Sequence, residues 1–89
     1  MYDLSKAGRT AVHTSCRLLT SSGYTVERIS GIGRRFDIIA WNHGRLLGIV
    51  VRTSRNGGIA RFSSLVQSLV EIVRKQQFPG EVRIWILQS

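Results

Sequence analysis

The sequence predicts an α/β fold in which a mixed four-stranded sheet carries one helix on each face. Two segments have apolar residues at helical spacing, and four shorter segments are rich in β-branched and aromatic residues. These segments follow one another in the order α-β-β-β-α-β. The chain has 89 residues, which is the length of one small domain, so we expect a single domain over residues 1–89.

The first helix is expected over residues 5–22. Asp3 or Ser5 can cap its N-terminus, and Gly23 suits the left-handed residue that follows the last helical turn. Its loose apolar face consists of Ala7, Ala11, Val12, Cys16, Leu18 and Leu19. A short strand is expected next, over residues 24–29, because its β-branched and aromatic residues favour an extended backbone.

Two further strands are expected at residues 36–41 and 45–53, joined by a turn around His43 and Gly44. A two-residue and a four-residue turn give the same register, in which Asp37 stands opposite Val50. One face of this hairpin is then wholly apolar and consists of Phe36, Ile38, Ala40, Leu47, Ile49 and Val51. We expect that face to pack against the second helix, and the other face to bring Asp37, Val50 and Arg52 together.

The second helix is expected over residues 59–77, where apolar residues recur at helical spacing. They are Phe62, Leu65, Val66, Leu69, Val70 and Val73. Pro79 and Gly80 end the helix, and residues 81–87 form the last strand. A connection of this length allows a right-handed crossover, which predicts that the last two strands are parallel.

Charge is the strongest compositional signal. Thirteen Lys and Arg residues, eleven of them arginine, against five acids give a net charge of +8. Arginine binds phosphate through a planar two-pronged donor, so nucleic acid is the expected partner. The alternatives are a basic surface that only aids solubility or one that meets an acidic protein. The lone Cys16, the N-terminus without a signal peptide and the lack of a long apolar run indicate a cytoplasmic protein without a membrane partner.

The central hairpin carries a familiar pattern. Asp37 lies on one strand, and Val50 and Arg52 lie thirteen and fifteen residues later on the next. A strand-borne aspartate, a hairpin and then Glu-x-Lys is the signature of the PD-(D/E)XK nucleases, whose common core has the order α-β-β-β-α-β. The chain most resembles the archaeal Holliday junction resolvases of that superfamily over residues 6–88. The matching residues are Lys6-Ala7-Gly8, Gly23-Tyr24, Ser30-Gly31 and Asp37-Ile38-Ile39-Ala40. The Mrr-type restriction endonucleases, with their Gly-x-Asp-x-Ile pattern, are the second resemblance.

The resemblance implies a restriction-endonuclease-like fold, a homodimer and a degenerate active site. The family aspartate is retained as Asp37, but the first-helix glutamate is replaced by Val12. The motif glutamate is replaced by Val50 and the motif lysine by Arg52. Mg²⁺ prefers several converging anionic oxygens, so we expect no metal and no other cofactor at this poor site. We expect Arg52 to pair with Asp37 in place of a metal ion.

The basic residues are better candidates for function. In the resolvase arrangement, the first helix, the loop before Asp37 and the end of the third strand surround one cleft. The residues expected to contact phosphate there are Lys6, Arg9, Arg34, Arg35, Arg52 and Arg55. Four other arginines are expected to be solvated surface residues: Arg28, Arg45, Arg74 and Arg83.

Three functions remain open from the sequence. The first is a resolvase-like protein that binds DNA as a homodimer without cutting it. The second is an active Mg²⁺-dependent endonuclease in which Glu71 or Glu27 completes a site with Asp37, although Glu71 more simply pairs with Lys75. The third is a regulatory subunit that contacts only protein. His13 and His43 have no partner acid at a recognisable spacing, so neither is expected to be catalytic.

Overall fold

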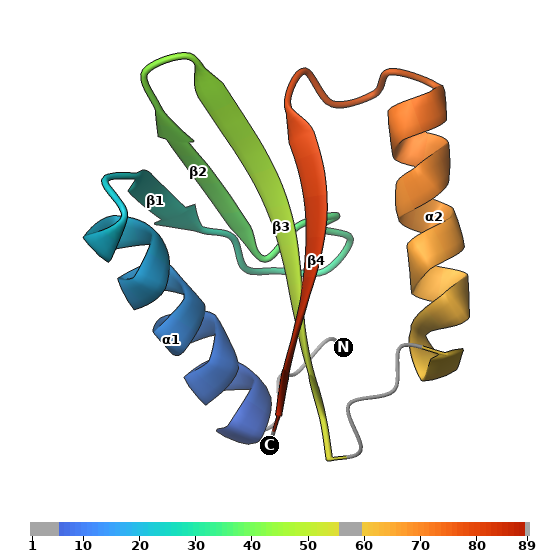
Figure 1. The fold of residues 1–89 in the computed structure, drawn as a ribbon. Coiled ribbons are helices and arrows are strands. Elements are labelled where there is room, and N and C mark those ends of the chain that lie inside the picture. Colours follow the sequence, from blue (N-terminus) through green and yellow to red (C-terminus); the bar gives the residue numbers. More distant parts are fainter. Residues whose placement is uncertain (1–5, 56–59, 89) are drawn as a thin grey trace.

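The computed structural model describes residues 6–55 and 60–88. The elements in chain order are helix α1 (Lys6–Ser21), strands β1 (Thr25–Arg28), β2 (Ile38–Asn42) and β3 (Arg45–Ser54), the 3-10 turn η1 (Ala60–Phe62), helix α2 (Ser63–Arg74) and strand β4 (Glu81–Gln88). This order confirms the expected α-β-β-β-α-β arrangement (Figure 1). Within the described ranges, no helix is long and apolar enough to cross a membrane.

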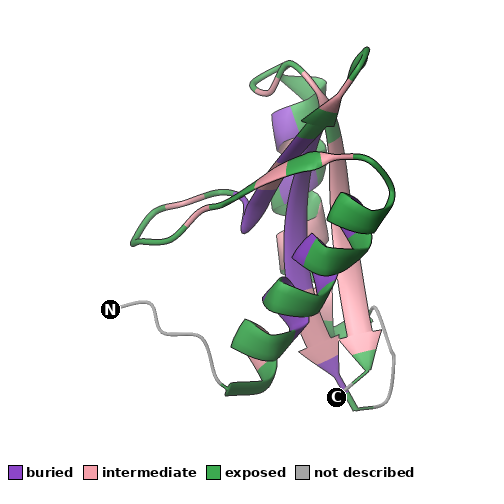
Figure 2. Ribbon diagram, turned by 90° about the vertical axis from the view of Figure 1, so that its left-hand side faces the viewer, coloured by how far each residue is buried: buried purple, intermediate pink, exposed green. Residues whose placement is uncertain are grey.

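The four strands form one sheet in the order β1-β2-β3-β4. Strands β1, β2 and β3 are antiparallel neighbours, whereas β4 runs parallel to β3 after the connection through α2. The sheet is therefore mixed, as the sequence predicts. Figure 2 shows that β3 is buried along most of its length, whereas β4, at one edge, is half-buried along most of its length.

Helix boundaries follow local backbone chemistry. Helix α1 ends where Gly23 adopts a φ of 92°, which is the left-handed residue expected after its last turn. Helix α2 is shorter than the sequence predicts. It begins at Ser63 after the 3-10 turn, without a side-chain cap, and it ends before Gln76, whose φ is 54°. Ile59, where this helix was expected to begin, lies outside the described residues.

Two apolar clusters fill the two faces of the sheet, and their assignment corrects one expectation. The expected apolar face of the hairpin packs against α1, not against α2. The buried residues of the cluster that this face forms with α1 are Ala11, Val12, Cys16, Leu19, Ile38, Ala40, Leu47, Ile49 and Val51. Side-chain alternation shows which residues share a face of a strand, but it does not show which helix covers that face.

Phe36 is the second correction. The expected register is confirmed from Ile38 to Asn42, but it does not extend to Asp37. Ile49 is the register partner of Ile38, yet its carbonyl also accepts a hydrogen bond from the amide of Asp37 at 2.9 Å. Two consecutive residues thus face one, as in a β-bulge. The alternation shifts, and Phe36 packs on the α2 side with Val50 and its neighbours Leu69 and Ile72.

Candidate nucleic-acid interface

Asp37 lies immediately before β2 and is only 4% exposed. Its Oδ1 accepts hydrogen bonds from Nε and Nη2 of Arg34, each at 3.0 Å. Its Oδ2 accepts from the amide of Val51 at 2.8 Å and from Nη1 of Arg52 at 3.1 Å. The expected ion pair between Asp37 and Arg52 is therefore confirmed, and Arg34 adds a second guanidinium that the sequence reasoning did not assign to this carboxylate.

Arg34 also shapes the loop that precedes Asp37. Its Nη1 donates to the carbonyl of Gly31 at 3.0 Å. Gly31 and Gly33 have φ values of 111° and 82°, which residues with a Cβ rarely adopt. The Arg34 side chain is only 10% exposed, so it serves as an internal cross-link between this loop and the sheet.

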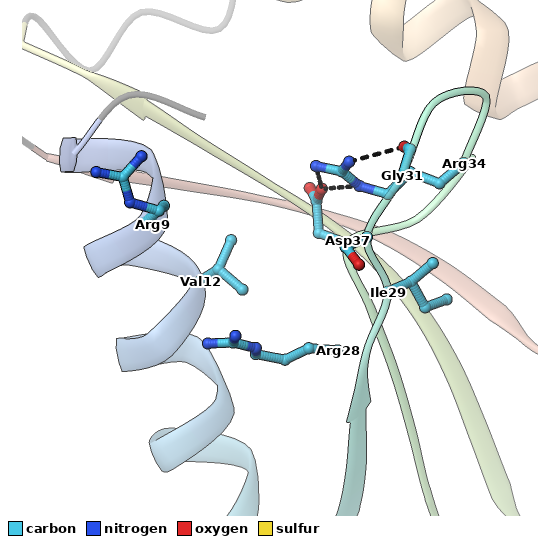
Figure 3. Close-up of a pocket in the computed structure, with 8 residues that line it drawn as sticks. Arg9, Val12, Arg28, Ile29, Gly31, Arg34 and Asp37 are labelled. Atoms are coloured by element: carbon cyan, nitrogen blue, oxygen red, sulfur yellow. Dashed lines mark hydrogen bonds and ion pairs between the residues drawn. The ribbon is translucent and has the colours of Figure 1, made fainter. Parts of the chain in front are cut away.

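A cavity of about 320 Å³ lies between α1 and the β1–β2 loop, and we call it the arginine cleft. It is lined by Arg9, Val12, Arg28, Ile29, Ser30, Gly31, Arg34 and Asp37. Figure 3 shows Arg28 extending from the sheet toward α1 at the level of Val12. Three arginines thus line a cleft with one carboxylate, and the excess of positive charge favours an anionic ligand.

Arg28 is exposed, as expected for a surface residue, but it also lines the arginine cleft, which sequence reasoning did not predict. A signal for it was available. Val26 packs against the cluster beneath α1, and Arg28 follows two residues later on the same strand. Residues two apart on a strand share a face, so Arg28 also projects to the α1 side. The three other arginines expected to be surface residues each pair with an acid: Arg45 and Arg83 with Glu81, and Arg74 with Glu71.

The six expected phosphate contacts divide into two groups. Arg9 and Arg34 line the arginine cleft. A neighbouring cavity of about 50 Å³ is lined by Gly31, Gly33, Arg34, Arg35, Asp37, Val50 and Arg52. Four of the six basic residues therefore line one or both of the two cavities that include Asp37. Lys6 instead lines a separate cavity with Thr10, Thr53 and Leu87, and Arg55 is exposed just beyond the end of β3.

Mg²⁺, which the nuclease resemblance implies, does not fit the residues around Asp37. Both oxygens of Asp37 already accept hydrogen bonds from guanidinium groups. The neighbouring positions are Val12 in the arginine cleft and Val50 in the smaller cavity, and neither side chain offers an oxygen. Across residues 6–55 and 60–88, His, Cys, Asp and Glu form no group of three or more that could hold a metal ion.

The two carboxylates considered as replacements are placed elsewhere. Glu71 accepts a hydrogen bond from Arg74 at 2.6 Å and lies 3.7 Å from Lys75, which directly follows α2. The expected pairing of Glu71 with Lys75 is thus present, and the stronger partner is Arg74, whose hydrogen bond lowers the pKa of Glu71. Glu27 is exposed on β1. His13 and His43 are likewise exposed, on α1 and in the β2–β3 turn.

Comparison with known proteins adds one finding. No protein-family model and no curated protein matches the sequence. The fold matches the 1.6 Å structure of Hjc, a Holliday junction resolvase from the archaeal hyperthermophile Archaeoglobus fulgidus, with a TM-score of 0.69, 20% sequence identity and 94% of this chain covered. The chain spans 66% of that structure, which is slightly less than two thirds of its length. This likeness confirms the restriction-endonuclease-like fold that the sequence predicts.

Proposed function

We propose that this domain, which has the fold of an archaeal Holliday junction resolvase, binds DNA in its arginine cleft without cutting it. One observation carries the proposal. Arg34 and Arg52 donate hydrogen bonds to both carboxylate oxygens of Asp37, beside a cleft that Arg9 and Arg28 also line. Guanidinium groups bind phosphate oxygens through charge-assisted hydrogen bonds. A net charge of +8 favours association with a polyanion at any base sequence.

The absence of cleavage follows from the same contacts. A metal ion at Asp37 would have to displace two guanidinium groups, and it would find valine at both neighbouring positions. A guanidinium group has no acceptor for a proton, so Arg52 does not replace the motif lysine as a general base. No cofactor is needed for the binding that we propose.

Removing cleft arginines is expected to weaken DNA binding. In the double variant Arg9→Ala/Arg28→Ala, affinity for a duplex should fall about tenfold. The number of counterions released on binding, which the salt dependence of the affinity reports, should fall by about two. The matched control is Arg17→Ala/Arg61→Ala, which removes the same charge from exposed residues that line neither the arginine cleft nor the smaller cavity. Fluorescence anisotropy over a salt series measures both quantities. An equal loss in the two variants would show that net charge, not the cleft, sets the affinity.

Cleavage is tested separately on branched, duplex and single-stranded DNA with Mg²⁺ or Mn²⁺. All three DNAs are expected to remain intact. Metal-dependent cleavage that disappears in Asp37→Asn would overturn the proposal and favour the nuclease alternative. Failure to bind any of the three DNAs at low salt would instead favour the protein-interaction alternative.

A second copy of this chain is the partner we propose for the groove between α2 and β4. The groove has a volume of about 380 Å³ and is lined by Val66, Leu69, Val70, Val73, Arg74, Val82, Arg83 and Ile84. Val70 and Val73 are 54% and 57% exposed. Arg74 and Arg83 at its rim are paired with Glu71 and Glu81. In a chain of net charge +8, an apolar groove whose two rim arginines are each ion-paired with an acid reduces the charge repulsion between two copies.

The homodimer is tested with Val70→Lys, which adds a charge to the groove at an exposed helical position. Light scattering coupled to gel filtration is expected to give a dimer for the wild type and a monomer for this variant. Leu18→Lys is the matched control, because Leu18 on α1 is 55% exposed and lies outside the groove. A wild-type protein that stays monomeric at about 100 μM, where an interface of this class should associate, would exclude this role for the groove.

Cys16 fits the reducing cytoplasm that we propose as the compartment. The residue is a free, buried cysteine on the sheet side of α1. Burial raises the pKa of its thiol, which keeps the sulfur protonated and unreactive near neutral pH. Its role is therefore that of a small apolar side chain in the core.

A further inference from the structure

The loop between β1 and β2 presents one apolar side chain to solvent. Ile32 is 79% exposed, more than the other large apolar residues exposed in the described part of the chain. It stands between Gly31 and Gly33, both with positive φ, at the turn of a loop that otherwise carries Ser30, Arg34 and Arg35. A branched apolar residue at a basic, glycine-flanked turn has no role in packing this domain.

The loop holds Ile32 in a fixed place. Arg34 bridges the turn by donating to the carbonyl of Gly31, and two further nitrogens of the same guanidinium bind Asp37. Figure 3 shows the loop arching between Gly31 and Arg34 on the side away from α1, with these bonds at its base. A side chain presented on a tethered loop loses less conformational freedom on binding than one on an untethered loop.

The position of this loop connects Ile32 with the cleft. Gly31 and Arg34, on either side of the turn, line the arginine cleft, and Gly33 and Arg35 line the smaller cavity next to it. A nucleic-acid backbone held by the arginines of the cleft would therefore run past the loop that carries Ile32. Arg35, which is exposed beside Ile32, would then lie within reach of that backbone.

We propose that Ile32 is a wedge that inserts between stacked bases of the bound DNA. The proposal rests on the DNA binding proposed above and deepens it by naming the substrate class, which is duplex DNA with an easily opened base step at a bulge or mismatch. Architectural DNA-binding proteins insert apolar side chains between base steps, at the cost of unstacking them. A step that is already unpaired costs less to open, so the wedge favours it over intact duplex.

The test compares two DNAs that differ only in a two-nucleotide bulge, with 2-aminopurine placed beside the bulge. Wild-type protein is expected to bind the bulged DNA more tightly and to raise the fluorescence of 2-aminopurine as the base unstacks. Ile32→Ala should weaken binding to the bulged DNA about tenfold, which corresponds to the loss of one buried aliphatic side chain. Binding to the intact duplex should change less than about twofold, because phosphate contacts dominate there.

Leu18→Ala is the matched control, because it truncates another exposed aliphatic residue, on α1, that lies outside both cavities. Ile32→Met should retain most of the preference for the bulge, since it keeps apolar bulk, whereas Ile32→Ser should lose it. An unchanged affinity of Ile32→Ala for bulged DNA, or an equal loss on both DNAs, would overturn the wedge while DNA binding itself stands. If wild-type protein binds neither DNA, both proposals fail, and Ile32 is then a protein contact.

Discussion

Replacing Asp37 by alanine is expected to lower the free energy of unfolding by about 3 kcal/mol, because it leaves buried cations without their counter-charge. The Arg34 side chain is 10% exposed and has no room to move its guanidinium into water without releasing the loop. The amide of Val51 also loses its acceptor, and Arg52 loses its ion pair. Urea unfolding followed by the fluorescence of Trp41 and Trp85 measures the loss.

A double-mutant cycle separates two contributions to this loss of stability: the missing Arg34–Asp37 ion pair and the buried Arg34 cation that remains without a counter-charge. Arg34→Met/Asp37→Ala is expected to recover part of the stability that Asp37→Ala loses, since no buried charge then remains unpaired. Glu81→Ala is the matched control. Glu81 also binds two arginines, Arg45 and Arg83, but on an exposed surface, so its removal should change stability little. An Asp37→Ala protein as stable as the wild type would mean that the cluster does not hold the loop.

The second large effect concerns the two valines that stand where the resembled nucleases carry glutamate. Val50→Glu is expected to cost about 3 kcal/mol or more, because it places a carboxylate in an apolar cluster. Val50 is 2% exposed and packs with Phe36, Leu69 and Ile72. Val12→Glu should cost much less, although Val12 is also buried, because position 12 lines the arginine cleft.

Thermal unfolding of Val12→Glu and Val50→Glu measures this contrast, with Val12→Gln and Val50→Gln as uncharged controls of similar shape. At position 12 the carboxylate should be better tolerated than the amide, and at position 50 it should be worse. Position 12 opens on the arginine cleft of about 320 Å³, whereas Val50 packs among apolar side chains beside a cavity of only about 50 Å³. Equal stability of the two glutamate variants would mean that the sheet can turn position 50 toward solvent. The same reasoning predicts the outcome for V12E/V50E/R52K, which would restore the nuclease ligands. This variant should be too unstable to fold, and so should not bind a metal ion.

The sequence predicted correctly those features of the fold that depend on short-range patterns. Alternation and turn length gave the register of β2 and β3 from Ile38 onward, and the nearness of positions 37 and 52 led to the ion pair that the structure contains. The order of elements and the parallel pairing of β4 followed from the length of each connection.

The missed features depend on contacts between segments that no local pattern encodes. The shift at Asp37 comes from one extra residue in β2, which changes the face of Phe36 without altering the composition of the strand. The helix that covers each face depends on the path of the chain around the sheet. Arg34 was expected to contact phosphate. Its ion pair with Asp37 was not predicted, because that pair depends on the folded shape of the loop between the two residues.

The cluster at Asp37 has a consequence for the environments in which this protein works. A catalytic metal ion exchanges with solution, so its site fills and empties with the supply of that ion and is emptied by chelators. Arg34 and Arg52 are attached to the same chain as the carboxylate they neutralise, and their effective concentration does not change on dilution. The protein should therefore stay folded in EDTA and under metal starvation, conditions under which a metal-dependent nuclease loses its activity.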